Sequence, residues 1–165
     1  MNFEKIVYNH KDEIVKTFQE LLQIPSVLDE SDASVGAPFG NNIRKALEYM
    51  LAKGKEDGFE VLNDEGYAGR ISYKCGNQKE SVGILCHLDV VPEGNNWTYP
   101  PYEARIVDGK IFARGTTDDK GPTIACYYAL KFIKETNIKL KKEIQIILGT
   151  DEETGWRGVN HYFKK

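Results

Sequence analysis

The sequence predicts a mixed α/β fold in which a largely parallel sheet is flanked by helices, and two observations lead to this prediction. Segments with apolar residues at helical spacing alternate with short runs that are apolar throughout, as strands buried on both faces are. Alternation of this kind places helices between successive strands of one sheet. The 165 residues are enough for one domain of ordinary size with its own hydrophobic core.

An amphipathic helix is predicted for the N-terminal segment, and it ends before Pro25 because the residue that precedes a proline avoids the α conformation. Residues 25–40 are rich in Ser, Asp, Gly and Pro and therefore predict a long loop. A second amphipathic helix follows, which Asn41 or Asn42 can cap and which Gly58 can end. The apolar positions of the first helix are Phe3, Ile6, Val7, Ile14, Val15, Phe18, Leu21 and Leu22.

Strand-like segments occupy the middle of the chain. Residues 69–73 form a short candidate, and residues 82–88 form a continuous apolar run that is typical of a strand buried on both faces. Residues 105–107 and 110–113 flank an Asp-Gly pair, which is a strong indication of a hairpin turn. The hairpin indicates that part of the sheet is antiparallel.

The last third of the chain continues the alternation. Residues 123–135 predict a third helix, residues 143–148 another buried strand, and residues 158–165 the beginning of a further helix. Open α/β sheets bind ligands outside the carboxyl ends of their strands. Polar residues that follow the predicted strands are therefore the first candidates for a functional site.

Composition excludes several classes of function. The net charge is −3, and no basic block or basic helical stripe favours the binding of nucleic acid. The apolar runs are far shorter than the roughly 20 residues that span a membrane, and the first residues lack the apolar core of a signal peptide, so we expect a cytoplasmic protein. Cys75, Cys86 and Cys126 are odd in number and far apart, which predicts free thiols rather than disulfides or a cysteine zinc site.

His87 and Asp89 form the first polar cluster, at the end of the run 82–88. Residues i and i+2 of a strand point to the same face, so the His87 ring and the Asp89 carboxylate lie side by side. A histidine that binds a metal usually donates its other ring N–H to a carboxylate or a carbonyl, and Asp89 is well placed to accept it. The alternative is a histidine that only satisfies its hydrogen bonds at the end of a strand.

Asp118 and Asp119 form the second cluster and precede the helix predicted for residues 123–135. Two adjacent carboxylates at this position can cap the helix and interact with its dipole. They can also bind divalent cations, which accept carboxylate oxygens readily. The pair by itself leaves both interpretations open.

Asp151, Glu152 and Glu153 form the third cluster, just after the strand predicted for residues 143–148. Three consecutive acids can be only a solvated loop, but like charges crowded beside a core are unfavourable unless a cation neutralises them. A glutamate near a metal can also take a proton from a metal-bound water. Because the three clusters should lie at one edge of one sheet, together they predict a metal site.

Several motifs of the chain resemble the aminoacylase and carboxypeptidase family of two-zinc metallopeptidases, and their order and spacing match over nearly the whole chain. Three further details resemble the PepV-type bacterial dipeptidases within that family, namely APFG at residues 37–40, DDKGP at residues 118–122 and TGW at residues 154–156. The motifs of the family lie at residues 84–92, Trp97, residues 100–102, 108–111, 114–121 and 150–155.

The resemblance implies a role for five residues. His87 would bind one zinc ion, Asp118 would bridge both ions, and Glu153 would bind the second ion. Asp89 would orient His87, and Glu152 would be the general base when a bridging water attacks the scissile amide. The implied cofactors are two zinc ions, with Co²⁺ or Mn²⁺ as substitutes, and the implied substrate is a small peptide.

Members of the family also have a separate lid domain and two further metal ligands, an aspartate and a histidine, which this chain does not match. Residues 1–165 therefore resemble the N-terminal portion of the catalytic domain, without the lid domain or the C-terminal part. We expect an incomplete and inactive piece of a zinc metallodipeptidase, with a cis peptide bond between Asp118 and Asp119. A non-catalytic module, or a deacylase of N-acyl amino acids, is the alternative. We also expect self-association, because an incomplete sheet exposes apolar edge surface.

Overall fold

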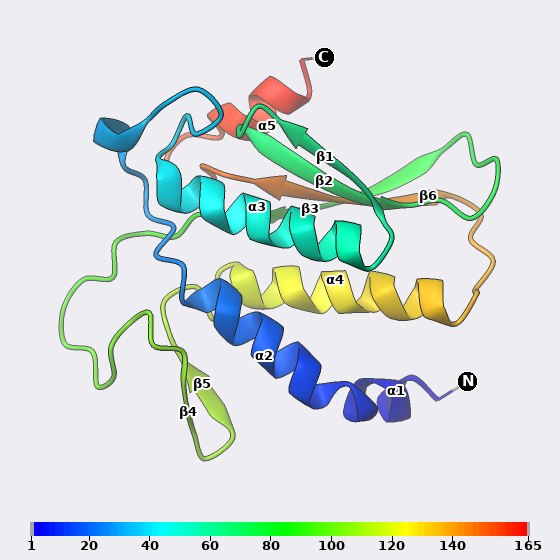
Figure 1. Ribbon diagram of the computed structural model, residues 1–165, viewed down its shortest axis with the longest axis horizontal. Coiled ribbons are helices and arrows are strands. Elements are labelled where there is room, and N and C mark those ends of the chain that lie inside the picture. The colour runs from blue at the N-terminus through cyan, green and yellow to red at the C-terminus, as the bar shows by residue number, and fades with distance from the viewer. Residues whose placement is uncertain (1, 165) are drawn as a thin grey trace.

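A mixed four-stranded sheet organises the computed structural model, which describes residues 2–164 (Figure 1). Its strands are β1 (Glu60–Asp64), β2 (Ala68–Tyr73), β3 (Ser81–His87) and β6 (Glu143–Gly149). They lie in the order β1, β2, β6, β3. The pairs β1–β2 and β2–β6 are antiparallel, and β3 pairs with β6 in parallel.

The predicted mixed α/β class with flanking helices is confirmed, but the expectation of a largely parallel sheet needs correction. One of the three strand pairs of this four-stranded sheet is parallel. β1 has no counterpart in the prediction, and it joins β2 through a short turn at residues 65–67. A connection this short allows only an antiparallel pair, whereas the parallel pair β3–β6 has a long crossover.

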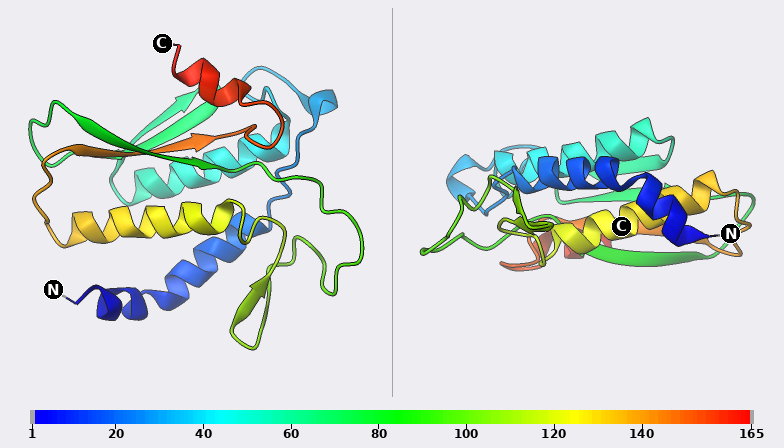
Figure 2. Two further views of the ribbon diagram at one scale, coloured as in Figure 1. Left: turned by 180° about the vertical axis from the view of Figure 1, so that it is seen from behind. Right: turned by 90° about the horizontal axis from the view of Figure 1, so that it is seen from below.

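Helices cover the two faces of the sheet unequally. α3 (Asn41–Glu56) and α4 (Lys120–Glu135) lie on one face, and α2 (Lys11–Leu22) packs against α4 on the side away from the sheet (Figures 1 and 2). α5 (Arg157–Tyr162) lies on the opposite face, and α1 (Phe3–Asn9) precedes α2. No helix among residues 2–164 is long and apolar enough to cross a membrane.

The hydrophobic core fills the space between the sheet and the helices α3 and α4. Ile71 of β2 and Ile146 of β6 are paired in the register, and both are fully buried. They belong to one apolar cluster with Leu47, Met50 and Tyr127 from the two helices. Burial of each large apolar side chain stabilises the fold by roughly 1.5–3 kcal/mol, so this cluster holds the strands that carry the site.

The single N-terminal helix that the apolar pattern predicts is two helices, with a break at His10. The His10 backbone leaves the helical conformation, and its Nδ1 lies 2.9 Å from the Ile6 carbonyl oxygen. The ring also packs against Phe132 at a centroid distance of 4.9 Å. Ile6 and Ile14 both pack against the core cluster. The helical spacing of apolar residues therefore continues across His10, and the sequence pattern gives no sign of the break.

The start of α3 also differs from the prediction. Its N-cap residue is Gly40, with φ of 103°, rather than Asn41 or Asn42. The carboxylate of Asp32 accepts a hydrogen bond from the Asn41 backbone N–H at 3.1 Å and so supplies the cap from the preceding loop. Gly58 lies just beyond the helix with φ of 72°, which confirms the predicted stop.

The hairpin predicted around the Asp-Gly pair is confirmed as β4 (Arg105–Val107) and β5 (Lys110–Phe112). Asp108 and Gly109 both have positive φ, as a tight two-residue turn requires. The two strands form a sheet of their own, so the expectation that they belong to the main sheet is wrong. Figure 1 shows the hairpin projecting from the body of the fold below the start of α4.

β3 is an edge strand, and the expectation that it is buried on both faces is wrong. It pairs with β6 on one side only, and Val82 and Leu85 expose 47% and 45% of their surface. The strand has no charged residue and no proline before His87, and these are the usual protections of an open edge. The continuous apolar run of residues 82–88 therefore belongs to an edge strand that lacks these protections, and not to a strand buried on both faces.

We expect the chain to self-associate through the β3 edge, because an open edge without charge pairs readily with another strand. The substitution Val82→Lys places a charge on this edge and should shift sedimentation equilibrium toward the monomer. Val35→Lys, at a fully exposed loop position, is the matched control and should leave the association unchanged. An unsubstituted chain that is strictly monomeric would contradict the prediction.

Candidate metal centre

The three acidic and histidine clusters meet at one end of the sheet. His87 ends β3, and Glu152 and Glu153 follow the end of β6, which runs parallel to β3. Asp118 and Asp119 immediately precede α4, whose first turn lies at the same end of the sheet in Figure 1. The structure thus brings together the residues that the sequence singles out, from three segments far apart in the chain.

His87, Asp118 and Glu153 form the group in which a metal ion fits. Each offers one ligand atom, and the three atoms lie within 4.8 Å of one another. His87 Nε2 is 2.9 Å from Asp118 Oδ1, and the Asp118 side chain is 73% exposed. One imidazole nitrogen and two carboxylate oxygens are a donor set that suits zinc and also Co²⁺ or Mn²⁺. The residues present therefore fit the expected cofactor.

Electrostatics favour a cation at this position. Burial raises the pKa of the Glu153 carboxyl, and the nearby negative charge of Asp118 raises it further. Burial likewise raises the pKa of Asp119. Carboxylates that repel one another in a partly buried site gain stability when a divalent ion neutralises them.

Asp89 connects the histidine to the glutamate loop. Its backbone carbonyl oxygen lies 3.0 Å from His87 Nδ1, and its carboxylate Oδ1 lies 3.4 Å from the same nitrogen. The carboxylate also accepts the backbone N–H of Glu152 at 3.0 Å and that of Glu153 at 2.9 Å. The Nδ1 contacts leave Nε2 of His87 facing Asp118, and the buried carboxylate holds the loop that follows β6.

Asp119 has a different task from Asp118. The peptide bond between them is cis, as the family resemblance implies. Asp119 is the N-cap residue of α4, but its side chain makes no cap hydrogen bond. Its Oδ2 instead accepts the backbone N–H of His87 at 3.0 Å. The helix-cap interpretation of this pair is therefore wrong for its side chains.

The sequence places Asp151 in the third acidic cluster, but its structural role was not predicted. It is fully buried, and its carboxylate accepts the backbone N–H groups of Arg157 at 2.9 Å and Gly158 at 2.7 Å. A Cβ atom at Gly158 would lie 2.1 Å from the Tyr67 carbonyl oxygen, so this position requires glycine. Asp151 thus caps α5 across the loop that carries Glu152.

The cysteines take no part in the metal centre. Cys75, Cys86 and Cys126 are free thiols, as their number and spacing predict. Cys86 is buried, and burial together with neighbouring Cys126 raises its pKa to about 12. A thiol with a pKa this high is a poor nucleophile at neutral pH.

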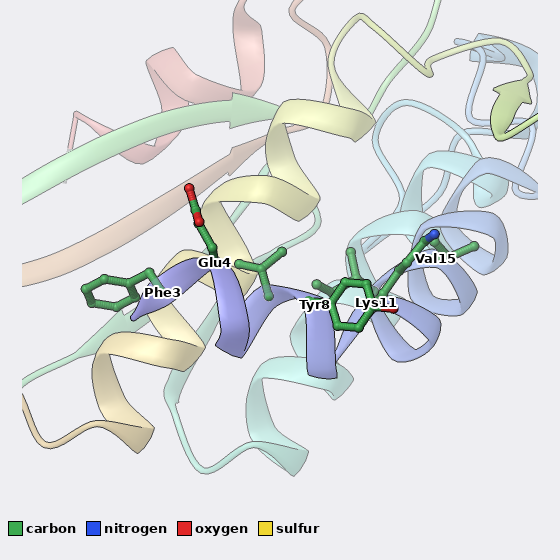
Figure 3. Close-up of a pocket in the computed structure, with 7 residues that line it drawn as sticks. Phe3, Glu4, Tyr8, Lys11 and Val15 are labelled. Atoms are coloured by element: carbon green, nitrogen blue, oxygen red, sulfur yellow. The ribbon is translucent and has the colours of Figure 1, made fainter. Parts of the chain in front are cut away.

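A separate groove of about 550 Å³ lies along the N-terminal helices (Figure 3). Its lining is almost entirely apolar, from Phe3 and Val7 of α1 to Ile14 and Val15 of α2. Glu4 is its one carboxylate. The groove therefore lacks the groups from which a metal centre is built.

Comparisons with known proteins identify a protein family whose members resemble this chain. Residues 83–165 match the family model described as Peptidase family M20/M25/M40. "Putative dipeptidase YtjP" of Bacillus subtilis is 46% identical over 164 residues, which are 99% of this chain and 35% of that protein. A "Putative dipeptidase" of Staphylococcus epidermidis is 45% identical over 158 residues, or 96% of this chain and 33% of that protein. The chain spans about a third of the length of the curated relatives it matches.

Solved structures share the fold. Human carnosine dipeptidase 1 superposes with a TM-score of 0.79 at 24% identity, over 97% of this chain and 36% of that one. The M20 family metallo-carboxypeptidase Sso-CP2 of Sulfolobus solfataricus has a TM-score of 0.73 at 23% identity, over 92% of this chain and 34% of that one. At these identities the likeness concerns the fold alone.

Protonation of His87 leads to a prediction on pH. Burial opposes the charge on the ring, but Asp89 and Asp118 outweigh burial and raise the pKa of His87 to about 9 in the metal-free chain. A metal binds the neutral imidazole, so binding at pH 7 must release this proton. We expect zinc affinity to rise about tenfold per pH unit between pH 6 and pH 8. Calorimetry in buffers of different ionisation enthalpy measures the released proton, and an affinity that does not change over this range would contradict the prediction.

Proposed function

The chain belongs to peptidase family M20/M25/M40, and on this premise we propose that its metal centre serves the hydrolysis of the amide bond of dipeptides. The observation that carries the proposal is the group of His87, Asp118 and Glu153, whose ligand atoms converge at the carboxyl ends of β3 and β6. The names of the relatives from Bacillus and Staphylococcus support the dipeptide as substrate.

Zinc is the metal that we propose for this centre, with His87 and Asp118 holding one ion and Asp118 and Glu153 the second. Asp118 can serve both because its exposed carboxylate has a second oxygen beyond the one near His87. Bound zinc polarises a substrate carbonyl and lowers the pKa of a water molecule. The buried Asp89 keeps His87 in the orientation that presents Nε2 to the centre.

Glu152 is the proposed general base. Its Oε2 lies 3.8 Å from His87 Nε2, so its carboxylate is beside the centre without being one of the three converging ligands. Its backbone N–H is held by Asp89 at 3.0 Å, which keeps the side chain at this position. Glu152 takes a proton from the attacking water and passes it to the leaving amine nitrogen.

We further propose that the 165-residue chain by itself binds zinc weakly and hydrolyses no dipeptide. A catalytic zinc ion normally has three protein ligands. With Asp118 shared, each of two ions receives two ligands from the group found among residues 2–164. An ion with an incomplete protein shell is bound more weakly, which supports the view that this chain carries part of a site.

Zinc titration of the chain by calorimetry tests the centre. Asp118→Asn should abolish binding, because it removes the charge of the shared carboxylate. Glu152→Gln should leave binding unchanged, because this residue is a base and not a ligand. Glu48→Gln is the matched control at a surface carboxylate that only pairs with Arg44. Zinc affinity that is the same in the Asp118→Asn variant would refute the proposed ligand set.

The catalytic role of Glu152 is best measured in a longer relative that turns substrate over. In a preparation of the "Putative dipeptidase YtjP" of Bacillus subtilis that hydrolyses a dipeptide, replacing the residue that aligns with Glu152 by glutamine should lower kcat about 10²–10⁴-fold while the metal content stays the same. The 165-residue chain assayed beside it should show no dipeptide hydrolysis with added zinc. Turnover by the chain would contradict its proposed inactivity, and undiminished kcat in the variant would contradict the general base.

A further inference from the structure

We propose that Lys120 is a positioning residue, which sets the place of the Asp118 carboxylate relative to His87 by anchoring the start of α4 to the end of α2. The inference rests on the proposed function, since it assigns a task to a residue that follows the metal-binding pair. Lys120 is one of the largest fully buried side chains of the protein. It has no part in the chemistry described above.

The Lys120 amino group is held by backbone carbonyl groups. Nζ donates a hydrogen bond to the Leu21 carbonyl oxygen at 3.1 Å and another to that of Ile24 at 2.6 Å. These carbonyls lie in the last turn of α2 and just after it, where the negative end of the helix dipole favours a cation. Burying a lysine is costly, and an apolar side chain would fill the same volume at lower cost. Packing alone therefore does not explain why a lysine occupies this buried position, and its hydrogen bonds to the end of α2 indicate another role.

The residues that follow α2 also hold the segment that directly follows His87. Ser26 Oγ donates to the Leu88 carbonyl oxygen at 2.6 Å, and the Val90 backbone N–H donates to the Ser26 carbonyl oxygen at 3.0 Å. Ser26 is fully buried. The segment from Leu21 to Ser26 therefore contacts the residues that directly follow His87 through Ser26, and the start of α4 through Lys120.

Lys120 is close to Asp118 in the chain, so the contacts of Lys120 restrict the position of the Asp118 backbone. Lys120 follows Asp118 by two residues, and its backbone N–H donates to the Gly115 carbonyl oxygen at 3.1 Å. The aliphatic stem of Lys120 also packs on Gly115, where a Cβ atom would lie 3.2 Å from Cδ. The contacts between Lys120 and Gly115 therefore join the two ends of the loop formed by residues 115–120. The hydrogen bond from the His87 N–H to Asp119 then fixes this loop against β3.

Contacts that do not involve Lys120 also hold α2 against α4. Thr17 Oγ1 and the Tyr128 hydroxyl share a buried hydrogen bond of 2.8 Å, and Lys131 pairs with Glu13 at 2.7 Å. These contacts join the same two helices away from the metal centre. Thr17→Val is consequently a matched control, because it removes a buried hydrogen bond between the two helices without changing the contacts at the start of α4.

The experiment compares Lys120→Met with Thr17→Val. Lys120→Met keeps a long flexible side chain but loses the hydrogen bonds to α2. We expect its zinc affinity to fall about 10- to 100-fold, as is usual when a group that supports metal ligands is removed. We also expect the metal-free crystal structure to show His87 Nε2 and Asp118 Oδ1 no longer within hydrogen-bond distance. Thr17→Val should lower the thermal midpoint to a similar extent and leave the affinity and this distance unchanged.

Unchanged zinc affinity together with an unchanged His87–Asp118 distance in Lys120→Met would overturn the proposal, and so would an equal loss of affinity in Thr17→Val. If Lys120→Met does not fold, Lys120→Gln takes its place, because its shorter polar side chain weakens the hydrogen bonds to Leu21 and Ile24 and should also move Asp118 relative to His87. If the unsubstituted chain binds no zinc, the proposed zinc binding by this chain fails, and the kcat of the longer relative still tests the proposed function. The distance in the metal-free crystals still decides whether Lys120 positions Asp118.

Discussion

The parallel pairing of β3 with β6 is the constraint on which the metal centre depends. The register places His87 beside Gly149, so the histidine lies next to the end of β6 and the glutamates begin three residues further on. If the two strands were antiparallel, His87 and Glu152 would lie at opposite ends of the sheet. A parallel pair needs a long crossover, and in this chain the crossover contains α4. The same connection that makes the pairing parallel therefore also delivers Asp118 to the site.

Four of the acidic residues around the centre divide into two groups with different surroundings. Asp89 and Asp151 are buried, and both carboxylates accept backbone N–H groups of the loop after β6 or of the start of α5. Charged groups are stable inside a protein when hydrogen bonds of this kind satisfy them. Asp118 and Glu153 have no such backbone partners among the contacts described above, and their oxygens face His87. The buried acids build the frame, and the accessible ones remain free to bind a cation.

Particular elements show how far the sequence could predict this structure. The strand around residues 143–148, the hairpin at Asp108 and the stop at Gly58 followed from local patterns, because turn geometry and burial act over a few residues. β1 and the break at His10 did not, since β1 is mostly exposed and the apolar period runs through the break. The role of Asp151 was hidden for a similar reason. Its partners lie six and seven residues away, and only the folded loop brings them to its carboxylate.

The sequence by itself determined the mixed α/β class, the stop of α3 at Gly58, the turn of the β4–β5 hairpin and the residues from which a metal centre is built. Spacing within one segment carries this information, because side chains alternate along a strand and residues two apart, such as His87 and Asp89, are therefore expected on the same face. Only the tertiary structure decided that Asp118 faces His87 while Asp119 turns back to the His87 amide, and that Lys120 is buried against the end of α2. The edge position of β3 was decided at the same level. Hydrogen bonds and strand pairs between distant segments depend on how the whole chain packs, and no local pattern of residues records them.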